Sequence, residues 1–135
     1  MARKYTYLIS TALLSALYLM SATFYLTQGD TVRQLLGQLS FPGYLVPLLI
    51  VAKLLGVAAI LSRVSVALSD LAYSGMFFHL LLALSAHLNT SDYQGSVPAL
   101  VGLVVLIASF LTQNAARARP SPHAPSHAAS QAAKA

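Results

Sequence analysis

The sequence contains no cysteine and no tryptophan, and it has only three acidic residues. The lack of cysteine excludes disulfides, thiolate metal sites, covalent haem attachment and dithiol redox chemistry within this chain. Charged residues make up only 8% of the chain, whereas hydrophobic residues make up 57% and the mean hydropathy is +0.70. A chain of 135 residues with this composition is too apolar for an ordinary soluble domain. We therefore interpret it as a small membrane protein.

Four apolar stretches are long enough, or nearly so, to cross a hydrocarbon core that takes about 20 residues of helix. They cover roughly residues 5–27, 44–62, 70–88 and 97–113. This pattern predicts an all-α fold, an antiparallel up-down bundle of four transmembrane helices within residues 1–114. The first stretch has an alternative as a signal peptide, because Arg3 and Lys4 precede it and Ser21 and Ala22 suit a cleavage site. Aromatic residues at both of its ends favour a full span.

The basic residues lie at the ends of these stretches and not in one patch, so we do not expect nucleic acid as a partner. If the N-terminus is cytoplasmic, the inner side carries six of them and the outer side only Arg33. The six are Arg3, Lys4, Arg63, Arg117, Arg119 and Lys134. The positive-inside rule then places both termini in the cytoplasm, and we predict a multi-pass protein of the bacterial cytoplasmic membrane.

The connections between the spans differ in character. The outer loop, 28–43, has apolar residues at helical spacing, which predicts a short helix on the membrane surface with Asp30 as its cap. The link 63–69 is short and predicts a hairpin between the second and third spans. The last segment, 115–135, is rich in Ala, Ser, Pro and His without periodicity, and we expect a disordered cytoplasmic tail.

Lys53 lies in the middle of the second apolar stretch, where a lysine costs about 2.5 to 3.5 kcal/mol on insertion scales. Counted from the link, Lys53 and His79 lie at the same depth. No acidic residue is near that depth, so the amine needs neutral acceptors or a ligand, with His79, Tyr18 and backbone carbonyls as candidates. Two charged groups would repel each other, so we expect a neutral His79. In the alternative interpretation Lys53 extends to the membrane surface from a shifted helix.

Small residues share a face with each polar residue, Gly56 with Lys53 and Gly75 with His79. Helix contacts in lipid favour such residues. Asp70 falls near the inner surface at the start of the third span, where a carboxylate suits a helix N-terminus. His87 falls near the outer end of the same span, where we expect an interfacial histidine.

Several motifs occur in the order found in the DoxX-like family. They are "FPGY" at 41–44, "KLLGVAAIL" at 53–61, "DLAYSGMFF" at 70–78 and "SAHLNTSD" at 85–92. The chain resembles this family of four-helix membrane proteins over residues 41–112. The positions that match the family pattern are Lys53, Gly56, Ala72, Tyr73, Gly75 and His87, with Asp70 in place of the usual Glu. His79 stands where the family commonly has Asp, so the family's internal pair of a lysine and a carboxylate is replaced here by Lys53 and His79. Leu82 stands where the family commonly has Gly.

The resemblance implies a redox-associated accessory subunit, since namesakes of the family resemble membrane subunits of quinone-linked oxidoreductases. A quinone-like or other small apolar ligand would bind at a polar core of Lys53, Gly56, Tyr73, Gly75, His79 and Tyr18, with Asp70 and His87 as secondary residues. A partner oxidoreductase subunit and a homo-oligomer are the expected protein partners, besides membrane lipid. The alternatives are a small oligomeric transporter or proton path, and a purely structural or assembly protein. The sequence shows no catalytic constellation and no metal site, and so does not indicate an enzyme.

Overall fold

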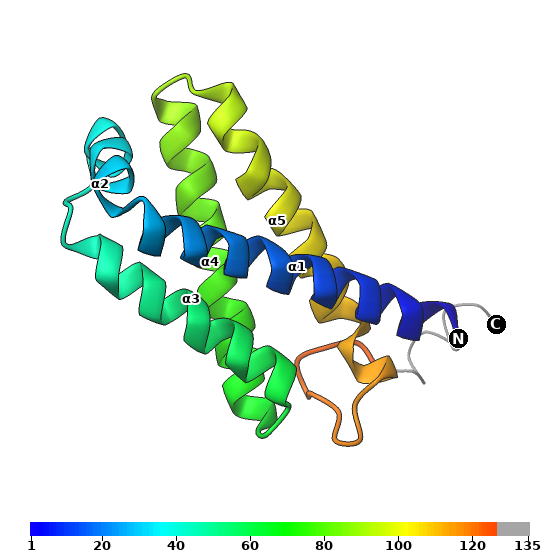
Figure 1. Ribbon diagram of the computed structural model, residues 1–135. Coiled ribbons are helices and arrows are strands. Elements are labelled where there is room, and N and C mark those ends of the chain that lie inside the picture. Colours follow the sequence, from blue (N-terminus) through cyan, green and yellow to red (C-terminus); the bar gives the residue numbers. More distant parts are fainter. Residues whose placement is uncertain (127–135) are drawn as a thin grey trace.

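The computed structural model describes residues 1–126, and this part of the chain consists of helices without any β-strand (Figure 1). In chain order the elements are α1 (Ala2–Thr27), α2 (Gly29–Gln38), α3 (Leu45–Ser62), α4 (Val66–Asn89), α5 (Tyr93–Thr112) and the 3₁₀ helix η1 (Gln113–Ala115). Four helical segments are long and apolar enough to cross a membrane: α1, α3, α4, and α5 together with η1. The predicted all-α fold with four spans is confirmed.

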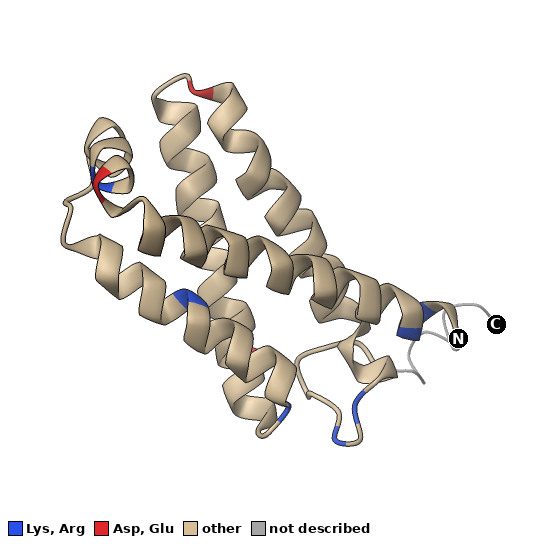
Figure 2. Cartoon of the chain, in the orientation of Figure 1, with Lys and Arg blue, Asp and Glu red and all other residues tan. Residues whose placement is uncertain are grey.

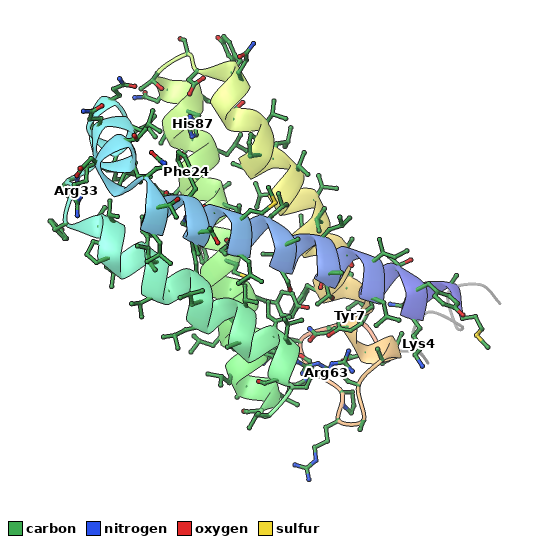
Figure 3. The ribbon with its side chains drawn as sticks, in the orientation of Figure 1. Lys4, Tyr7, Phe24, Arg33, Arg63 and His87 are labelled. Atoms are coloured by element: carbon green, nitrogen blue, oxygen red, sulfur yellow. The ribbon has the colours of Figure 1, made fainter. Side chains whose placement is uncertain are left out.

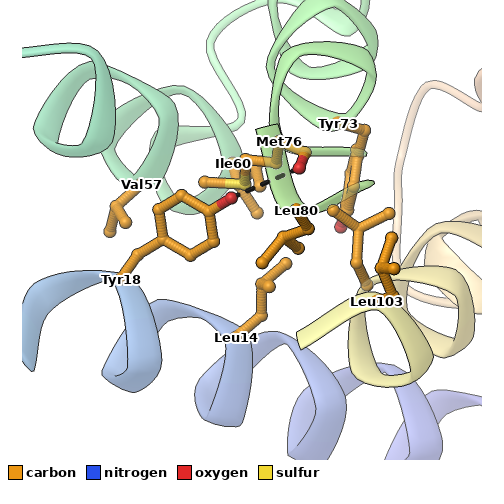
Figure 4. Close-up of a cluster of buried hydrophobic side chains, with 9 residues drawn as sticks. Leu14, Tyr18, Val57, Ile60, Tyr73, Met76, Leu80 and Leu103 are labelled. Atoms are coloured by element: carbon orange, nitrogen blue, oxygen red, sulfur yellow. Dashed lines mark hydrogen bonds between the residues drawn. The ribbon is translucent and has the colours of Figure 1, made fainter. Parts of the chain in front are cut away.

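The four long helices form a closed bundle. α1 packs against α3 and α5, and α4 packs against the same two helices, while α2 contacts the adjoining ends of α1 and α3 (Figure 1). The bundle encloses an apolar cluster to which all four long helices contribute (Figure 4). Its buried members are Leu14, Tyr18, Val57, Ile60, Tyr73, Met76, Leu80, Leu103 and Leu106.

Hydroxyl side chains lie inside the bundle beside this apolar cluster, and many further large apolar residues cover its outside. Thr11 Oγ1 on α1 is 2.7 Å from Ser109 Oγ on α5, and the Tyr73 hydroxyl on α4 is 2.6 Å from the same oxygen. These three buried side chains join three helices through hydroxyl groups. Ile9 and Met20 are among the many large apolar side chains that point outward. Such a surface suits hydrocarbon, and interhelical hydroxyl contacts are typical of helices packed in lipid.

α4 begins four residues earlier than the predicted span 70–88. Ser65 caps the helix, because its Oγ accepts a hydrogen bond from the Leu68 amide at 3.3 Å. The preceding helix ends at Ser62 and is followed by Arg63, whose backbone is left-handed with φ 53° and ψ 25°. The hairpin link is therefore only three residues long, Arg63 to Ser65.

α5 also begins four residues before the predicted span 97–113. An Asp92 carboxylate oxygen accepts a hydrogen bond from the Gly95 amide at 2.9 Å and so caps the helix at Tyr93. Pro98 consequently lies inside α5 and not at its start. The start predicted at residue 97 is wrong because Asp92, which precedes the apolar stretch, sets the beginning of the helix.

The helix predicted in the loop 28–43 is present as α2, while its position on the outer membrane surface stays a prediction. It buries Val32 and Leu36 against Val46 of α3. The prediction that Asp30 caps this helix is wrong. The helix begins at Gly29, and Gln28 is the N-cap residue, because the Gln28 carbonyl accepts the hydrogen bond of the Val32 amide. Asp30 lies within the first turn, where its charge suits the helix N-terminus, and pairs with Arg33 at 2.9 Å.

The two ends of the bundle differ in charge (Figure 2). Arg3 at the start of α1 donates a hydrogen bond to the Leu111 carbonyl at 2.9 Å, so the N-terminus and the end of α5 share one end of the bundle. Lys4, Arg63, Arg117 and Arg119 belong to the same end. The opposite end carries Asp30, Arg33 and Asp92. The asymmetry follows the predicted pattern, while the side of the membrane that each end faces stays a prediction.

The segment after α5 packs back against the start of α4. Ser121 Oγ donates a hydrogen bond of 2.6 Å to an Asp70 carboxylate oxygen. Asn114 Nδ2 donates to the carbonyls of Ser121 and Ala124, both at 2.9 Å. Residues 127–135 lie outside the described residues, and the disorder expected there stays a prediction.

Candidate functional site

Lys53 lies inside the bundle, and its side chain turns toward α1. The residue is only 4% exposed. Its Nζ donates a hydrogen bond of 2.8 Å to Ser21 Oγ and lies 3.6 Å from the centre of the Tyr25 ring. A desolvated cation over an aromatic face is worth about 2 kcal/mol. The amine is thus held by a hydroxyl and a ring, and it does not extend to the membrane surface.

His79 on α4 contacts Tyr18, another polar side chain of α1. The Tyr18 hydroxyl lies 2.9 Å from His79 Nδ1 and 3.3 Å from the Met76 carbonyl (Figure 4). The hydroxyl has one proton, so it donates either to the imidazole or to the carbonyl. In both arrangements Nε2 of His79 has no hydrogen-bond partner among the described residues, and this nitrogen remains available to a ligand.

Lys53 and His79 are not joined by a hydrogen bond. Lys53 lies nine residues before the end of α3 at Ser62, whereas His79 lies thirteen residues after the start of α4 at Val66. His79 is therefore about one helical turn farther from the hairpin link than Lys53. The sequence predicted equal depths for Lys53 and His79 because it assumed a link of residues 63–69. The Ser65 cap starts α4 earlier and so shortens this link.

Two cavities meet at these side chains. The first has a volume of about 190 Å³, lies between α1, α4 and α5, and reaches His87 and Gly95 near the outer loop. The second has a volume of about 330 Å³ and lies between α3 and α4. Tyr18, Lys53 and His79 line both cavities. We call these three residues the polar wall.

The two cavities differ in chemistry. The α3–α4 cavity is bordered outside the polar wall by side chains such as Leu49, Leu55 and Leu71, and by Gly56 and Gly75. A Cβ atom on Gly75 would meet nothing within 4 Å, so this glycine leaves open space. A Cβ on Gly56 would come within 2.9 Å of the flexible end of Met76. The cavity is apolar and suits a hydrocarbon group.

A polar cluster lies at the outer end of the first cavity. His87 Nδ1 is 2.8 Å from an Asp92 carboxylate oxygen, and the other oxygen accepts the Gly95 amide (Figure 3). The Gly95 hydrogen bond, followed by that of His87, lowers the pKa of Asp92 below its ordinary value of 3.8. A third cavity, of about 370 Å³, lies under α2 and shares Tyr25 and His87 with the first. Cavities therefore follow one another from the outer loop to Lys53.

The structure brings some of the expected site residues together and separates others. Lys53, His79 and Tyr18 form the polar wall, and Gly56 and Gly75 line the adjoining apolar cavity. Tyr73 belongs instead to the hydroxyl network with Ser109, while Asp70 holds the segment after α5. His87 lies at the end of the bundle near α2, away from the N-terminus (Figure 3).

Sequence reasoning missed Ser21 and Tyr25, the two contacts of Lys53. Both follow Tyr18 on one face of α1, at spacings of three and seven residues. That spacing was the signal that could have found them.

The polar wall offers hydrogen-bond donors without a reacting group. The amine or ammonium of Lys53 can donate to a carbonyl or an anion, and His79 can donate through Nε2 when the Tyr18 hydroxyl donates to Nδ1. Within residues 1–126 no group of three or more His, Asp or Glu is placed to hold a metal ion. The arrangement suits the binding of an amphiphilic molecule whose polar end meets the wall and whose apolar end enters the α3–α4 cavity.

Comparisons with known proteins agree with this architecture. The model of the DoxX-like family matches residues 9–109, which is most of the chain and includes the polar wall. No curated protein and no solved structure matches the chain. The chain is an integral membrane protein, and it belongs to the DoxX-like family.

Proposed function

We propose that this protein is an accessory subunit of a membrane redox complex and that it binds a quinone-like ligand at the polar wall. The observation that carries the proposal is the position of Tyr18, Lys53 and His79 on three different helices, where they border both the first cavity and the apolar α3–α4 cavity. A quinone combines carbonyl oxygens, which accept hydrogen bonds, with an apolar ring and tail. The wall would hold the carbonyls, and the α3–α4 cavity would hold part of the apolar portion.

The donor set fits such a ligand. When the Tyr18 hydroxyl donates to Nδ1, Nε2 of His79 carries the ring proton and has no partner among the described residues, and a protonated Lys53 keeps two hydrogens besides the one given to Ser21. Hydrogen bonds that involve charged groups contribute about 1.5–3 kcal/mol. Hydrogen bonds to a bound ligand would thus offset the free-energy cost of placing a lysine in the membrane.

The test is purification of the full chain in native lipid, followed by mass spectrometry of the bound quinones and proteins. We expect copurified quinone that falls at least tenfold in Lys53→Met, because the loss of one charge-assisted hydrogen bond changes affinity by about that factor or more. Lys4→Met, which removes a lysine at the end of the bundle, is the matched control and should retain the quinone. A copurified oxidoreductase subunit would identify the partner.

Two results would contradict the proposal. If quinone is absent from the wild-type preparation, or if Lys4→Met loses it as completely as Lys53→Met, the polar wall is not a quinone site. If Lys53→Leu also folds and supports growth as the wild type does, the polar core serves helix packing alone.

A further inference from the structure

A second cavity system lies at the basic end of the bundle, away from the polar wall. It has a volume of about 630 Å³ and lies between the α3–α4 link and the segment after α5. Three arginines line it, Arg63, Arg117 and Arg119. We call it the arginine pocket. No acidic side chain is among its lining residues, so three positive charges surround one hollow.

Arg63 has a backbone conformation that is unfavourable for any residue with a side chain. Its φ of 53° is left-handed, and this conformation raises the free energy of a non-glycine residue by about 1–2 kcal/mol. Glycine is the usual residue at this position after a helix. Its side chain is nevertheless well placed. The guanidinium donates a hydrogen bond of 3.1 Å to the Ala116 carbonyl and lies 5.1 Å from the centre of the Tyr7 ring (Figure 3). The side chain at this position therefore offsets the backbone strain, and it is directed toward the segment that closes the pocket.

The start of α4 adds backbone donors to the pocket. The amides of Leu68 and Ser69 are bonded to the side chain and the carbonyl of Ser65, respectively. The amides of Val66 and Ala67, two residues that line the pocket, have no acceptor among the described residues. Free amides at a helix N-terminus favour an anion.

The nearest carboxylate is already engaged elsewhere. Asp70 lies one turn into α4, accepts Ser121 Oγ at 2.6 Å and Gln113 Nε2 at 3.5 Å, and does not line the pocket. Nε of Arg117 is buried and has no hydrogen-bond partner within residues 1–126. None of the three guanidinium groups forms an ion pair with a carboxylate of residues 1–126, so this part of the chain leaves their positive charges uncompensated.

We propose that the arginine pocket binds a phosphate group, supplied by the headgroup of an anionic membrane phospholipid. Guanidinium groups pair with phosphate oxygens through two parallel hydrogen bonds, and the free amides of α4 complete such a site. The pocket is at the end of the spans, where phospholipid headgroups lie. Val64 beside it is 81% exposed, as suits a side chain that contacts acyl chains. The proposal is independent of the quinone site.

The test compares two variants that lower the net charge equally at the same end of the bundle. Arg117→Gln/Arg119→Gln removes two charges from the pocket, whereas Arg3→Gln/Lys4→Gln removes two that do not line it. The full chain, purified in a neutral detergent, is titrated with phosphatidylglycerol or phosphatidylcholine, and bound lipid is counted by native mass spectrometry. We expect the wild type and the control to prefer phosphatidylglycerol, and the pocket variant to bind it at least tenfold more weakly.

Further arms decide the source of the phosphate and check the fold. Competition by inorganic phosphate at low millimolar concentration, with no preference for phosphatidylglycerol, would show a site for free phosphate and overturn the lipid assignment. Equal loss in both double variants, or binding of neither lipid nor phosphate, would overturn the proposal altogether. Arg119→Glu, at an exposed position with no hydrogen bond or ion pair to the rest of residues 1–126, should fold normally and still weaken phosphatidylglycerol binding. Circular dichroism confirms that each variant retains its helices.

Discussion

Lys53 of α3 is tied to Ser21 of α1 by a hydrogen bond of 2.8 Å between the amine nitrogen and the hydroxyl oxygen. The bond joins two helices that are separated in sequence by the outer loop and α2. It gives a lysine in the membrane interior a neutral partner on the next helix of the bundle. The amine is thus hydrogen-bonded although no acidic side chain forms an ion pair with it among the described residues.

Ser21→Ala is expected to destabilise the protein by about 1–3 kcal/mol, because a buried amine then loses its hydrogen-bond acceptor. Thr23→Ala is the matched control. Its hydroxyl is exposed and bonds only to the Leu19 carbonyl of its own helix, so we expect little change. The measurement is thermal unfolding in detergent. In a Lys53→Met background the effect of Ser21→Ala should largely disappear, and an undiminished effect there would show that Ser21 acts independently of the lysine.

Much of the fold could be predicted because the hydrocarbon core sets the length of a span, and four apolar stretches satisfy that length. The helix starts were predicted less well. Ser65 and Asp92 cap α4 and α5 through single hydrogen bonds, and the apolar pattern does not record which polar residue of a link makes such a bond. A link shortened by four residues then changed the depth of His79 relative to Lys53.

Lys53 could be identified as a site residue from its cost in the membrane, but its contacts could not. The rotation of α1 about its axis decides whether Ser21 or another hydroxyl meets the amine, and that rotation is set by packing against α3 and α5. α1 also carries the buried residues Ser10, Thr11 and Ser15, of which Ser10 bonds to the Thr6 carbonyl and Thr11 to Ser109. The sequence therefore offered several candidate acceptors on one helix without a means to choose among them.

Gly75→Leu is expected to reduce copurified quinone at least tenfold while the thermal midpoint changes little. A side chain at Gly75 enters open space in the α3–α4 cavity, so it competes with a ligand without a clash. Ser74→Leu is the control, because the neighbouring residue does not line that cavity. Equal quinone content in the wild type and Gly75→Leu would show that the ligand does not use the apolar cavity.

Gly95→Ala and Gly37→Ala should change stability in opposite directions. A Cβ on Gly95 would overlap the Asp92 carboxylate and the His87 ring, and relieving such overpacking typically costs about 1–3 kcal/mol. A Cβ on Gly37 in α2 meets nothing within 4 Å, so the alanine should stabilise by about 0.5–1 kcal/mol through helix propensity. Thermal unfolding of the two variants checks both signs. A stabilised Gly95→Ala protein would contradict the arrangement at the start of α5.

The cap of α5 is expected to weaken in acid. The pKa of Asp92 is lowered by the Gly95 amide and by His87, so the folded carboxylate stays ionised to lower pH than the unfolded one. Its contribution is fully present above the ordinary value of 3.8 and is lost as the pH falls through the lower, folded pKa. Hydrogen exchange at the Gly95 amide should accelerate relative to the middle of α5 in that range. Asp92→Asn should abolish the pH-dependent part of this acceleration. Asp30→Asn changes the net charge by the same amount but should retain the pH dependence at Gly95.

Cysteine labelling can determine which end of the bundle faces the cytoplasm, and the absence of native cysteine makes any introduced thiol unique. Thr31 in α2 and Ala118 after α5 are exposed at opposite ends. With the basic end inside, an impermeant maleimide should label Thr31→Cys in intact cells, and Ala118→Cys only after permeabilisation. Lys53→Cys should resist the reagent from both sides, because the side chain at this position lies between helices. The reverse pattern for the two end positions would invert the topology, and prompt labelling at position 53 by a bulky reagent would show that the polar wall is open to bulk water.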